Sequence, residues 1–278
     1  MALISAAKGI FPAPVRKSLK KIYQSTLDLT DARSRHGDMI PPRSMNFVGD
    51  GDFMKTGLEF KRLFIEFGGL KPDHKVLDVG SGIGRMAGRL TSYLSPQGEY
   101  QGFDIVKMGI DWCQANITPR YPNFRFQHAD VRNDAYNPGG KYRSATYSFP
   151  YADGYFDFVY LTSVFTHMFT ADMERYLAEI SRVLKPGGTG FITLFLMNDE
   201  SRELIAKGRS SQNFIHKLDG CYTTMVENPE AAIAFEEDYM RSAVQRFGLS
   251  PSEPIHFGSW CGRSRFLSYQ DILITQKI

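Results

Sequence analysis

The sequence predicts a doubly wound α/β fold, in which helices cover both faces of a mostly parallel sheet. The main observation is that helical and extended patterns alternate from about residue 53 onward. A second observation is "KVLDVGSGIGRMAGRL", residues 75–90, where a hydrophobic run, a glycine turn and a helical stretch follow one another. With 42% hydrophobic and 23% charged residues, the 278-residue chain has enough apolar mass for one large domain.

The first half of this domain is predicted to alternate strictly between helix and strand. The expected elements are a helix over 51–70, a strand over 75–80, a helix over 83–94, a strand over 99–105, a helix over 106–117 and a strand over 124–131. Gly68 and Gly69 are expected to end the first helix, because glycine readily takes the left-handed conformation found after helix ends. This half therefore contributes three parallel strands.

The second half is predicted to contain four strands and two irregular insertions. The expected order is a loop over 132–154, a strand over 155–164, a helix over 171–184, a strand over 189–197, an irregular stretch over 198–228, a helix over 229–248 and closing strands over 253–260 and 270–277. "KPGG" is expected to stop the helix over 171–184. The chain then divides into an N-terminal segment, 1–52, and a seven-stranded domain, 53–278.

Composition argues against several classes of protein. The net charge of +3 is too mild for a nucleic-acid-binding protein. Cys113, Cys221 and Cys261 are few and widely spaced, so they form neither a disulfide framework nor a metal-ligand pattern. The six histidines show no pairing that would bind zinc, and we expect no metal. Such cysteine usage favours a reducing cytoplasm.

The N-terminus is basic. Lys8, Arg16, Lys17, Lys20 and Lys21 all precede the first acidic residue, Asp28, and apolar residues lie among them. Residues 1–25 are therefore a candidate for peripheral contact with an anionic membrane. The alternative is a solvated arm or a capping helix, which Pro12 and Pro14 would keep short.

Two interpretations compete for the glycine turn. "GIGRMA", residues 82–87, satisfies the dinucleotide-binding pattern G-x-G-x-x-A, and Asp104 follows at about the distance of an acid that binds ribose hydroxyls. Three further features favour a different nucleotide. Asp78 lies inside the first strand, Asp130 ends the third strand in "HAD", and a helix–"KPGG"–strand block follows "FDFVYLTSVFTHM".

Together these features resemble the class I S-adenosylmethionine-dependent methyltransferases over roughly residues 53–197. The resemblance implies a Rossmann-like, mostly parallel seven-stranded sheet that ends in an antiparallel C-terminal hairpin, which dinucleotide dehydrogenases lack. It also implies that the protein is an enzyme that uses S-adenosyl-L-methionine and releases S-adenosyl-L-homocysteine. This cofactor has no phosphate, so the glycines would serve to let the backbone approach it.

The resemblance also assigns residues to the cofactor site. These are Asp78, Gly80, Ser81, Gly82, Gly84, Asp104, Ile105, Asp130, Val131 and Thr162. It places Asp78 at the amino end of the cofactor, Asp104 at the two ribose hydroxyls and Asp130 near the adenine amine. Each acid also has a purely structural interpretation: Asp78 as a turn-stabilising residue, Asp104 as a strand-end cap and Asp130 as the start of an Asx turn.

His167, in "SVFTHM" at the exit of the fourth strand, is the candidate catalytic residue. Open α/β sheets bind ligands at the carboxyl ends of their strands, and histidine suits general-base catalysis near neutral pH. A hydroxyl acceptor benefits from such a base because it is a poor nucleophile while protonated. Helix capping or packing are the structural alternatives for this residue.

We expect the acceptor to be chosen by the insertions. The 132–154 loop contains aromatic and basic side chains that can stack on a sugar or hold a phosphate, and "PPRSMNFVGDGDF", residues 41–53, is expected to cover the cofactor. The sequence thus favours O-methylation of a small hydroxylated molecule or glycan, a saccharide above all. N-methylation of a small molecule or peptide, and a non-catalytic protein that binds S-adenosylmethionine, remain alternatives. The oligomeric state is left open.

Overall fold

The computed structural model describes residues 24–28, 39–49 and 51–278. Most of the predicted membrane contact, residues 1–25, therefore lies outside the described residues. Within these ranges, no helix combines the length and the apolar character needed to cross a bilayer.

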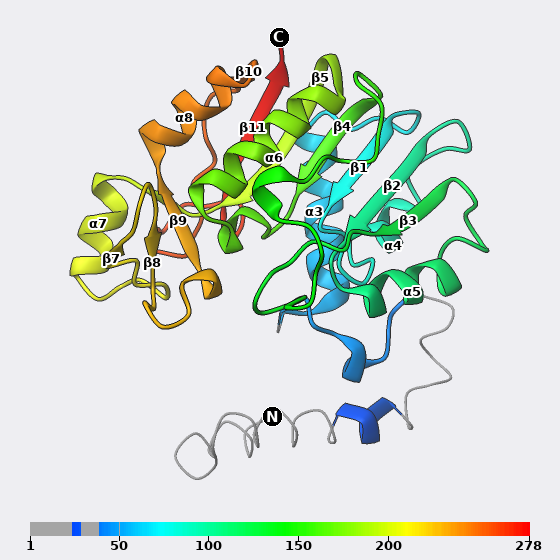
Figure 1. The fold of residues 1–278 in the computed structure, drawn as a ribbon, viewed down its shortest axis with the longest axis horizontal. Coiled ribbons are helices and arrows are strands. Elements are labelled where there is room, and N and C mark those ends of the chain that lie inside the picture. Colours follow the sequence, from blue (N-terminus) through cyan, green and yellow to red (C-terminus); the bar gives the residue numbers. More distant parts are fainter. Residues whose placement is uncertain (1–23, 29–38, 50) are drawn as a thin grey trace.

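A seven-stranded sheet forms the centre of the fold (Figure 1), which confirms the predicted fold class. Its strands, in spatial order, are β10 (Leu249–Pro251), β11 (Asp271–Lys277), β5 (Leu184–Leu194), β4 (Phe156–Leu161), β1 (Lys75–Val79), β2 (Glu99–Asp104) and β3 (Phe124–His128). The five strands from β5 to β3 are parallel, whereas β11 runs antiparallel to both β5 and β10. The predicted antiparallel ending is therefore present.

Helices cover both faces of this sheet. They are α3 (Phe53–Glu66), α4 (Ala87–Leu90), α5 (Lys107–Asn116), α6 (Thr170–Val183) and α8 (Glu237–Arg246). Figure 1 shows α6 in front of the sheet and α3 behind it. Successive strand residues alternate between two cores: Leu77 and Val79 face the α6 and α8 side, whereas Val76 faces the α3, α4 and α5 side.

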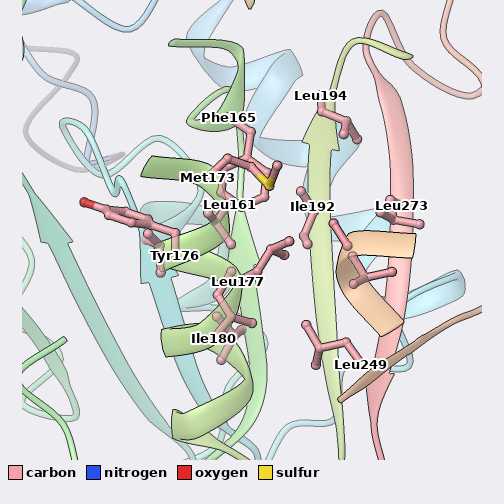
Figure 2. Close-up of a cluster of buried hydrophobic side chains, with 14 of the residues drawn as sticks. Leu161, Phe165, Met173, Tyr176, Leu177, Ile180, Ile192, Leu194, Leu249 and Leu273 are labelled. Atoms are coloured by element: carbon pink, nitrogen blue, oxygen red, sulfur yellow. The ribbon is translucent and has the colours of Figure 1, made fainter. Parts of the chain in front are cut away.

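The α6 face illustrates how the sequence pattern builds the core. Met173, Leu177 and Ile180 recur at helical spacing and are fully buried, where they pack toward Leu161 on β4 and Ile192 on β5 (Figure 2). Truncating one of these leucine or isoleucine side chains to alanine removes about 2–5 kcal/mol of stability, as is usual for a packed core. This layer holds the carboxyl end of β4 in place.

The predicted helix over 83–94 is mostly a series of turns, and only Ala87–Leu90 is α-helical. The backbone φ angles of Gly82 and Gly84 are +57° and +77°, so the chain cannot take helical geometry before residue 85. The predicted closing strand over 253–260 is reduced to an isolated antiparallel bridge between His256 and Ile272, and the strand that closes the sheet, β10, pairs at Leu249–Pro251 instead. Pro254 lacks a backbone N–H, and the N–H of Gly258 donates to the Asp271 carboxylate rather than to a strand.

The stretch over 198–228 was predicted to be irregular, but it contains regular secondary structure. It contains the helix α7 (Asp199–Ala206) and the strands β7 (His216–Lys217) and β8 (Tyr222–Thr223). The two strands form a second sheet with β6 (Leu196–Met197) and β9 (Ile233–Glu236), in the order β6-β9-β8-β7. Asn198 caps α7 through a reciprocal pair of bonds with Ser201. That capping pair was visible in the sequence as a helix start.

The predicted helix over 229–248 is correspondingly shorter. Residues Pro229–Ala231 form a 3₁₀ turn, Ile233–Glu236 form β9, and only Glu237–Arg246 are α-helical. Ile233, Ala234 and Phe235 are all buried, because β9 pairs with β6 on one side and β8 on the other. A strand with two neighbours can bury consecutive residues, and this tertiary pairing overrides the helical periodicity.

Candidate functional site

A cavity of about 460 Å³ opens at the carboxyl ends of the parallel strands. Its walls come from the turn after β1, the ends of β2 and β4, residues 47–49, and the segments around residues 230 and 270. A cavity of this size suits a small organic ligand, and this edge is where open α/β sheets bind theirs. The cavity is therefore the candidate active site.

The glycine turn after β1 forms one wall. Gly80 has a φ angle of +83°, and a Cβ atom placed there would lie 2.5 Å from Cγ2 of Val164. A Cβ atom at Gly82 would lie 2.5 Å from Cγ1 of Val48. Both positions require glycine, because the backbone is left-handed and the neighbouring side chains fill the space. Gly80, Ser81 and Gly82, three of the predicted cofactor residues, all line the cavity.

Asp104 ends β2 and lines the same cavity. One carboxylate oxygen accepts the N–H of Gly82 at 2.7 Å, and the other accepts the N–H of Val106 at 2.7 Å. Burial raises the pKa of this carboxyl to about 6, against the opposing effect of these two hydrogen bonds. Each oxygen retains capacity for a further hydrogen bond, so Asp104 both fixes the glycine turn and offers acceptors to a ligand.

Asp78 does not line the cavity. Its Oδ2 accepts the hydroxyls of Tyr100 at 2.5 Å and Tyr160 at 2.7 Å beneath the glycine turn. Its other oxygen, Oδ1, is buried without a hydrogen-bond partner among the described residues. Burial raises the pKa of the Asp78 carboxyl to about 7, and the charge of Asp104 contributes in the same direction.

The other predicted cofactor residues divide between the cavity and the structure around it. Ile105, Val131 and Thr162 line the cavity. Gly84 lies away from it, and its α-carbon faces Ile117 and Cys113 at close range. Asp130 also lies outside the lining; its carboxylate is 3.7 Å from the Lys141 ammonium.

His167 is on the cavity wall, in a 3₁₀ turn (Phe165–His167) that follows β4. Its Nδ1 lies 2.7 Å from the backbone carbonyl oxygen of Glu230, and the Tyr136 ring meets it edge-on at 5.7 Å. Burial lowers the pKa of this imidazole, so it is neutral near pH 7. Because the carbonyl can only accept, the Nδ1–H donates to it, and Nε2 carries the lone pair.

A covering segment forms the wall opposite the strands, and we call residues 39–49 the lid segment. In Figure 1 it is the blue stretch below the sheet. Its 3₁₀ turn (Arg43–Met45) is held by Asp28, whose carboxylate accepts the backbone N–H groups of Arg43 at 2.7 Å and Ser44 at 2.9 Å. Phe47 and Val48 line the cavity, and the covering role expected for residues 41–53 stays a prediction.

Sequence reasoning missed several lining residues that only the fold brings together. Gln270 comes from the connection just before β11, and its amide oxygen accepts the hydroxyls of Thr193 at 2.6 Å and Ser163 at 3.1 Å. Ser163 itself has a φ angle of +61°, unusual for a residue other than glycine. Thr166 lines the cavity with a buried hydroxyl that has no hydrogen-bond partner among the described residues. No sequence motif marks these positions.

Metal ligands are not grouped in this part of the chain. Among residues 24–28, 39–49 and 51–278, no cluster of three or more His, Cys, Asp or Glu side chains could hold a metal ion. Cys113, Cys221 and Cys261 are free and buried.

Comparison with protein families gives one matching model, described as a methyltransferase domain, over residues 76–188. This range runs from β1 to the "KPGG" turn inside β5. It therefore includes the glycine turn, Asp104 and His167, but not the lid segment or the second sheet.

Among curated proteins, the chain is 29% identical over 155 residues to a sterol 24-C-methyltransferase of Schizosaccharomyces pombe, covering 55% of this chain and 36% of that protein. It is 28% identical over 169 residues to a ubiquinone/menaquinone biosynthesis C-methyltransferase of Ectopseudomonas mendocina, covering 59% of this chain and 58% of that protein. The matched part thus spans less than two thirds of either relative.

Solved structures share the fold at low sequence identity. A SAM-dependent methyltransferase of Methanosarcina mazei superposes with a TM-score of 0.52 at 20% identity, covering 77% of this chain and 97% of that chain. The PH0226 protein of Pyrococcus horikoshii gives a TM-score of 0.56 at 15% identity, covering 84% of this chain and 95% of that chain.

Proposed function

From the match of residues 76–188 to a methyltransferase domain, we propose that the chain is a class I S-adenosylmethionine-dependent methyltransferase for a small hydroxylated acceptor. The observation that carries the proposal is His167 on the cavity wall, with its Nδ1 tied to Glu230 and its Nε2 left as the proton acceptor. S-adenosylmethionine would supply a methyl group already activated on a sulfonium and would leave as S-adenosylhomocysteine.

The residues of the cavity fit this cofactor. The left-handed backbone at Gly80 and Gly82 brings the turn itself to the cavity wall, where a ligand can approach it. The carboxylate of Asp104 has free acceptor capacity for ribose hydroxyls, and Ser81 presents a buried hydroxyl that lacks a partner among the described residues. Ile105 and Val131 would contact the adenine ring. We keep Asp78, Gly84 and Asp130 as contributors that act through the turn or through water, since none of the three lines the cavity.

The proposed base is His167. It would accept the acceptor's hydroxyl proton on Nε2 while the oxygen forms its bond to the methyl carbon, and the resulting imidazolium would remain bonded to the Glu230 carbonyl through Nδ1. Holding the acceptor in line and excluding water would supply the rest of the acceleration. The lid segment and the 132–154 loop are proposed to provide that exclusion, with residues 1–52 preceding the catalytic domain over 53–278.

The lining favours an acceptor with apolar or aromatic surface. Besides its polar groups, the cavity presents the side chains of Phe47, Val48, Phe60, Met86, Tyr136, Val164, Met168, Tyr176, Phe195 and Tyr269. A free saccharide would leave much of this surface without a matching apolar partner, because its hydroxyls must be hydrogen-bonded when they are buried. We therefore propose a hydroxylated apolar or aromatic molecule ahead of the saccharide that the sequence first suggested.

C-methylation is the second candidate, because two of the curated relatives are named as C-methyltransferases. The same base would serve this reaction. Removing a proton from a phenol or enol delocalises charge onto carbon as well as oxygen, so either atom can then accept the methyl group.

The test is a transfer assay with S-adenosylmethionine that carries a deuterated methyl group. Purified protein is incubated with panels of phenols, hydroxylated lipids, saccharides and amines, and products are identified by mass gain and by NMR of the new methyl group. Label on oxygen supports the proposal, and label on carbon selects the second candidate. If the label is found exclusively on nitrogen, both the O-methylation and the C-methylation proposals are contradicted. Tight S-adenosylhomocysteine binding without transfer to any acceptor would instead indicate the non-catalytic alternative.

A further inference from the structure

One cation of the cavity wall, Arg85, has no counter-ion within residues 24–28, 39–49 and 51–278. Arg85 follows the glycine turn and lines the cavity, but its guanidinium contacts no carboxylate of the described residues. Its partners are the backbone carbonyl oxygens of Val48 and Gly49 in the lid segment, both reached by one nitrogen, Nη2. The ring of Phe53 covers the guanidinium at 5.7 Å.

The remaining donors of this guanidinium have no partner in the part of the chain that the structure describes. There, Nε is buried without a hydrogen-bond partner, and no hydrogen bond joins Nη1 to another residue. Burial lowers the pKa of the Arg85 guanidinium. Keeping a half-buried guanidinium with unpaired donors costs free energy unless an anion accepts hydrogen bonds from it. A planar carboxylate can accept from two adjacent N–H donors of the guanidinium in a bidentate arrangement.

The surrounding geometry limits what that anion can be. Arg85 lies one residue after Gly84 and shares the cavity with Gly80 and Gly82, so its ligand belongs to the end of the cavity under the lid segment. The acids that line this cavity, Asp104, Asp172 and Glu230, have other hydrogen-bond donors. None of the acids that line the cavity among the described residues is therefore left to pair with Arg85, which favours an anion supplied by a ligand.

We infer that Arg85 binds the α-carboxylate of S-adenosylmethionine and, through its bonds to Val48 and Gly49, holds the lid segment over the bound cofactor. This inference rests on the proposed function. The Arg85 side chain then links the cofactor to the lid segment, because the same guanidinium donates hydrogen bonds to the cofactor carboxylate and to the lid backbone. Filling the cavity with the cofactor consequently stabilises the lid position, and a nucleoside that lacks the carboxylate does so less.

The experiment compares two ligands that differ in the part Arg85 is inferred to contact. S-adenosylhomocysteine carries the amino-acid moiety, whereas 5′-methylthioadenosine has the same nucleoside and thioether without it. Calorimetric titration of the full chain gives the ratio of the two affinities. In Arg85→Gln this ratio is expected to fall by about 10- to 100-fold, the size of charge-assisted hydrogen bonds, with methylthioadenosine affinity nearly unchanged. In Arg85→Lys, which keeps the charge but not the two adjacent N–H donors, the affinity ratio should lie between the wild-type value and that of Arg85→Gln.

The matched control is Arg62→Gln. Arg62 lies on α3 in an exposed pair with Glu66, so its loss should leave the ratio unchanged. A second measurement is backbone hydrogen exchange over residues 43–49. S-adenosylhomocysteine should slow this exchange in the wild type and in Arg62→Gln, and much less in Arg85→Gln.

Two results would overturn the inference. One is equal weakening of both ligands by Arg85→Gln, which would assign the residue a structural role; thermal melting of the variant would show whether its fold is intact. The other is an unchanged affinity for both ligands in Arg85→Gln, which would mean that the guanidinium does not contact the cofactor. If the wild-type protein binds neither ligand, the proposed function itself fails, and that outcome is distinct from unchanged affinities in a protein that binds both.

Discussion

The Nδ1 atom of His167 lies 2.7 Å from the backbone carbonyl oxygen of Glu230, across 63 residues of sequence. The carbonyl belongs to the 3₁₀ turn that leads into β9 of the second sheet, whereas His167 lies in the turn that follows β4 of the first sheet. The contact between these two turns therefore determines which imidazole nitrogen carries the proton. With Nδ1 committed as a donor, Nε2 is the ring atom that can take a proton. The orientation of the proposed base therefore depends on both sheets.

His167→Ala should lower turnover by about 10²- to 10⁴-fold, the usual contribution of a general base. His167→Asn is the sharper variant, because its amide can still donate to the Glu230 carbonyl but provides no base. Both variants should bind S-adenosylhomocysteine with wild-type affinity by calorimetry. Retention of most activity in His167→Asn would mean that the histidine is structural and that catalysis depends on alignment.

The pH profile tests the same residue independently. Burial lowers the pKa of His167 from its ordinary 6.5, and the base must be neutral to act, so kcat/KM should rise with pH through an inflection below 6.5. Activity is lost as the pH falls through that value. An inflection above 6.5 that persists in His167→Asn would belong to another group.

Asp104→Asn should weaken S-adenosylhomocysteine binding by about 10- to 100-fold, since charge-assisted bonds to ribose hydroxyls become neutral ones. The pKa of Asp104 is raised to about 6, so wild-type affinity should decline as the pH falls from 7 to 5 and the carboxyl becomes protonated. The variant should lack this decline. Asp111→Asn, at an exposed ion pair with Lys107, is the control. Equal affinities of Asp104→Asn and the wild type would exclude Asp104 as a ribose ligand.

Asp78 should make stability depend on pH. Its pKa is about 7 in the folded protein and near 3.8 when unfolded, so between these values the folded state retains a proton that the unfolded state releases. Stability from this group therefore falls as the pH rises from about 4 to about 7. Asp78→Asn removes the titration, so its Tm relative to the wild type should increase from pH 5 to pH 8. Parallel Tm curves for the two proteins would refute this.

Gln270→Glu tests whether the free amide donors of this residue face the acceptor. The substitution keeps an oxygen for the hydroxyls of Thr193 and Ser163, but it replaces the NH₂ group with a second oxygen. We expect kcat/KM for the acceptor to fall about 10-fold, the loss of one oriented hydrogen bond, with S-adenosylhomocysteine affinity unchanged. Gln276→Glu, at an exposed position of β11, is the control. A parallel loss of cofactor affinity would place Gln270 at the other end of the cavity.

Local patterns were sufficient to predict the central sheet except for its edge strand β10. The alternation of helices and strands, the glycines after β1 and the stripe of Met173, Leu177 and Ile180 each reflect an interaction within one element or between neighbours in sequence. The glycine turn was predictable for the same reason, because the need for a left-handed backbone at Gly80 and Gly82 is a property of those residues.

The second sheet and the acceptor end of the cavity were decided only by tertiary structure. Ile233, Ala234 and Phe235 follow a helical pattern in sequence but form β9, because they pair with strands drawn from residues 196 and 223. Gln270 and Glu230 carry no local motif, and they meet the cavity and His167 only because β11 and β9 bring them there. Arg85 follows the glycine turn in sequence, but its contact with Val48 and Gly49 depends on how the lid segment packs. Spacing along the chain identifies groups held by one turn or strand. Groups brought together from distant elements depend on how the sheets pack.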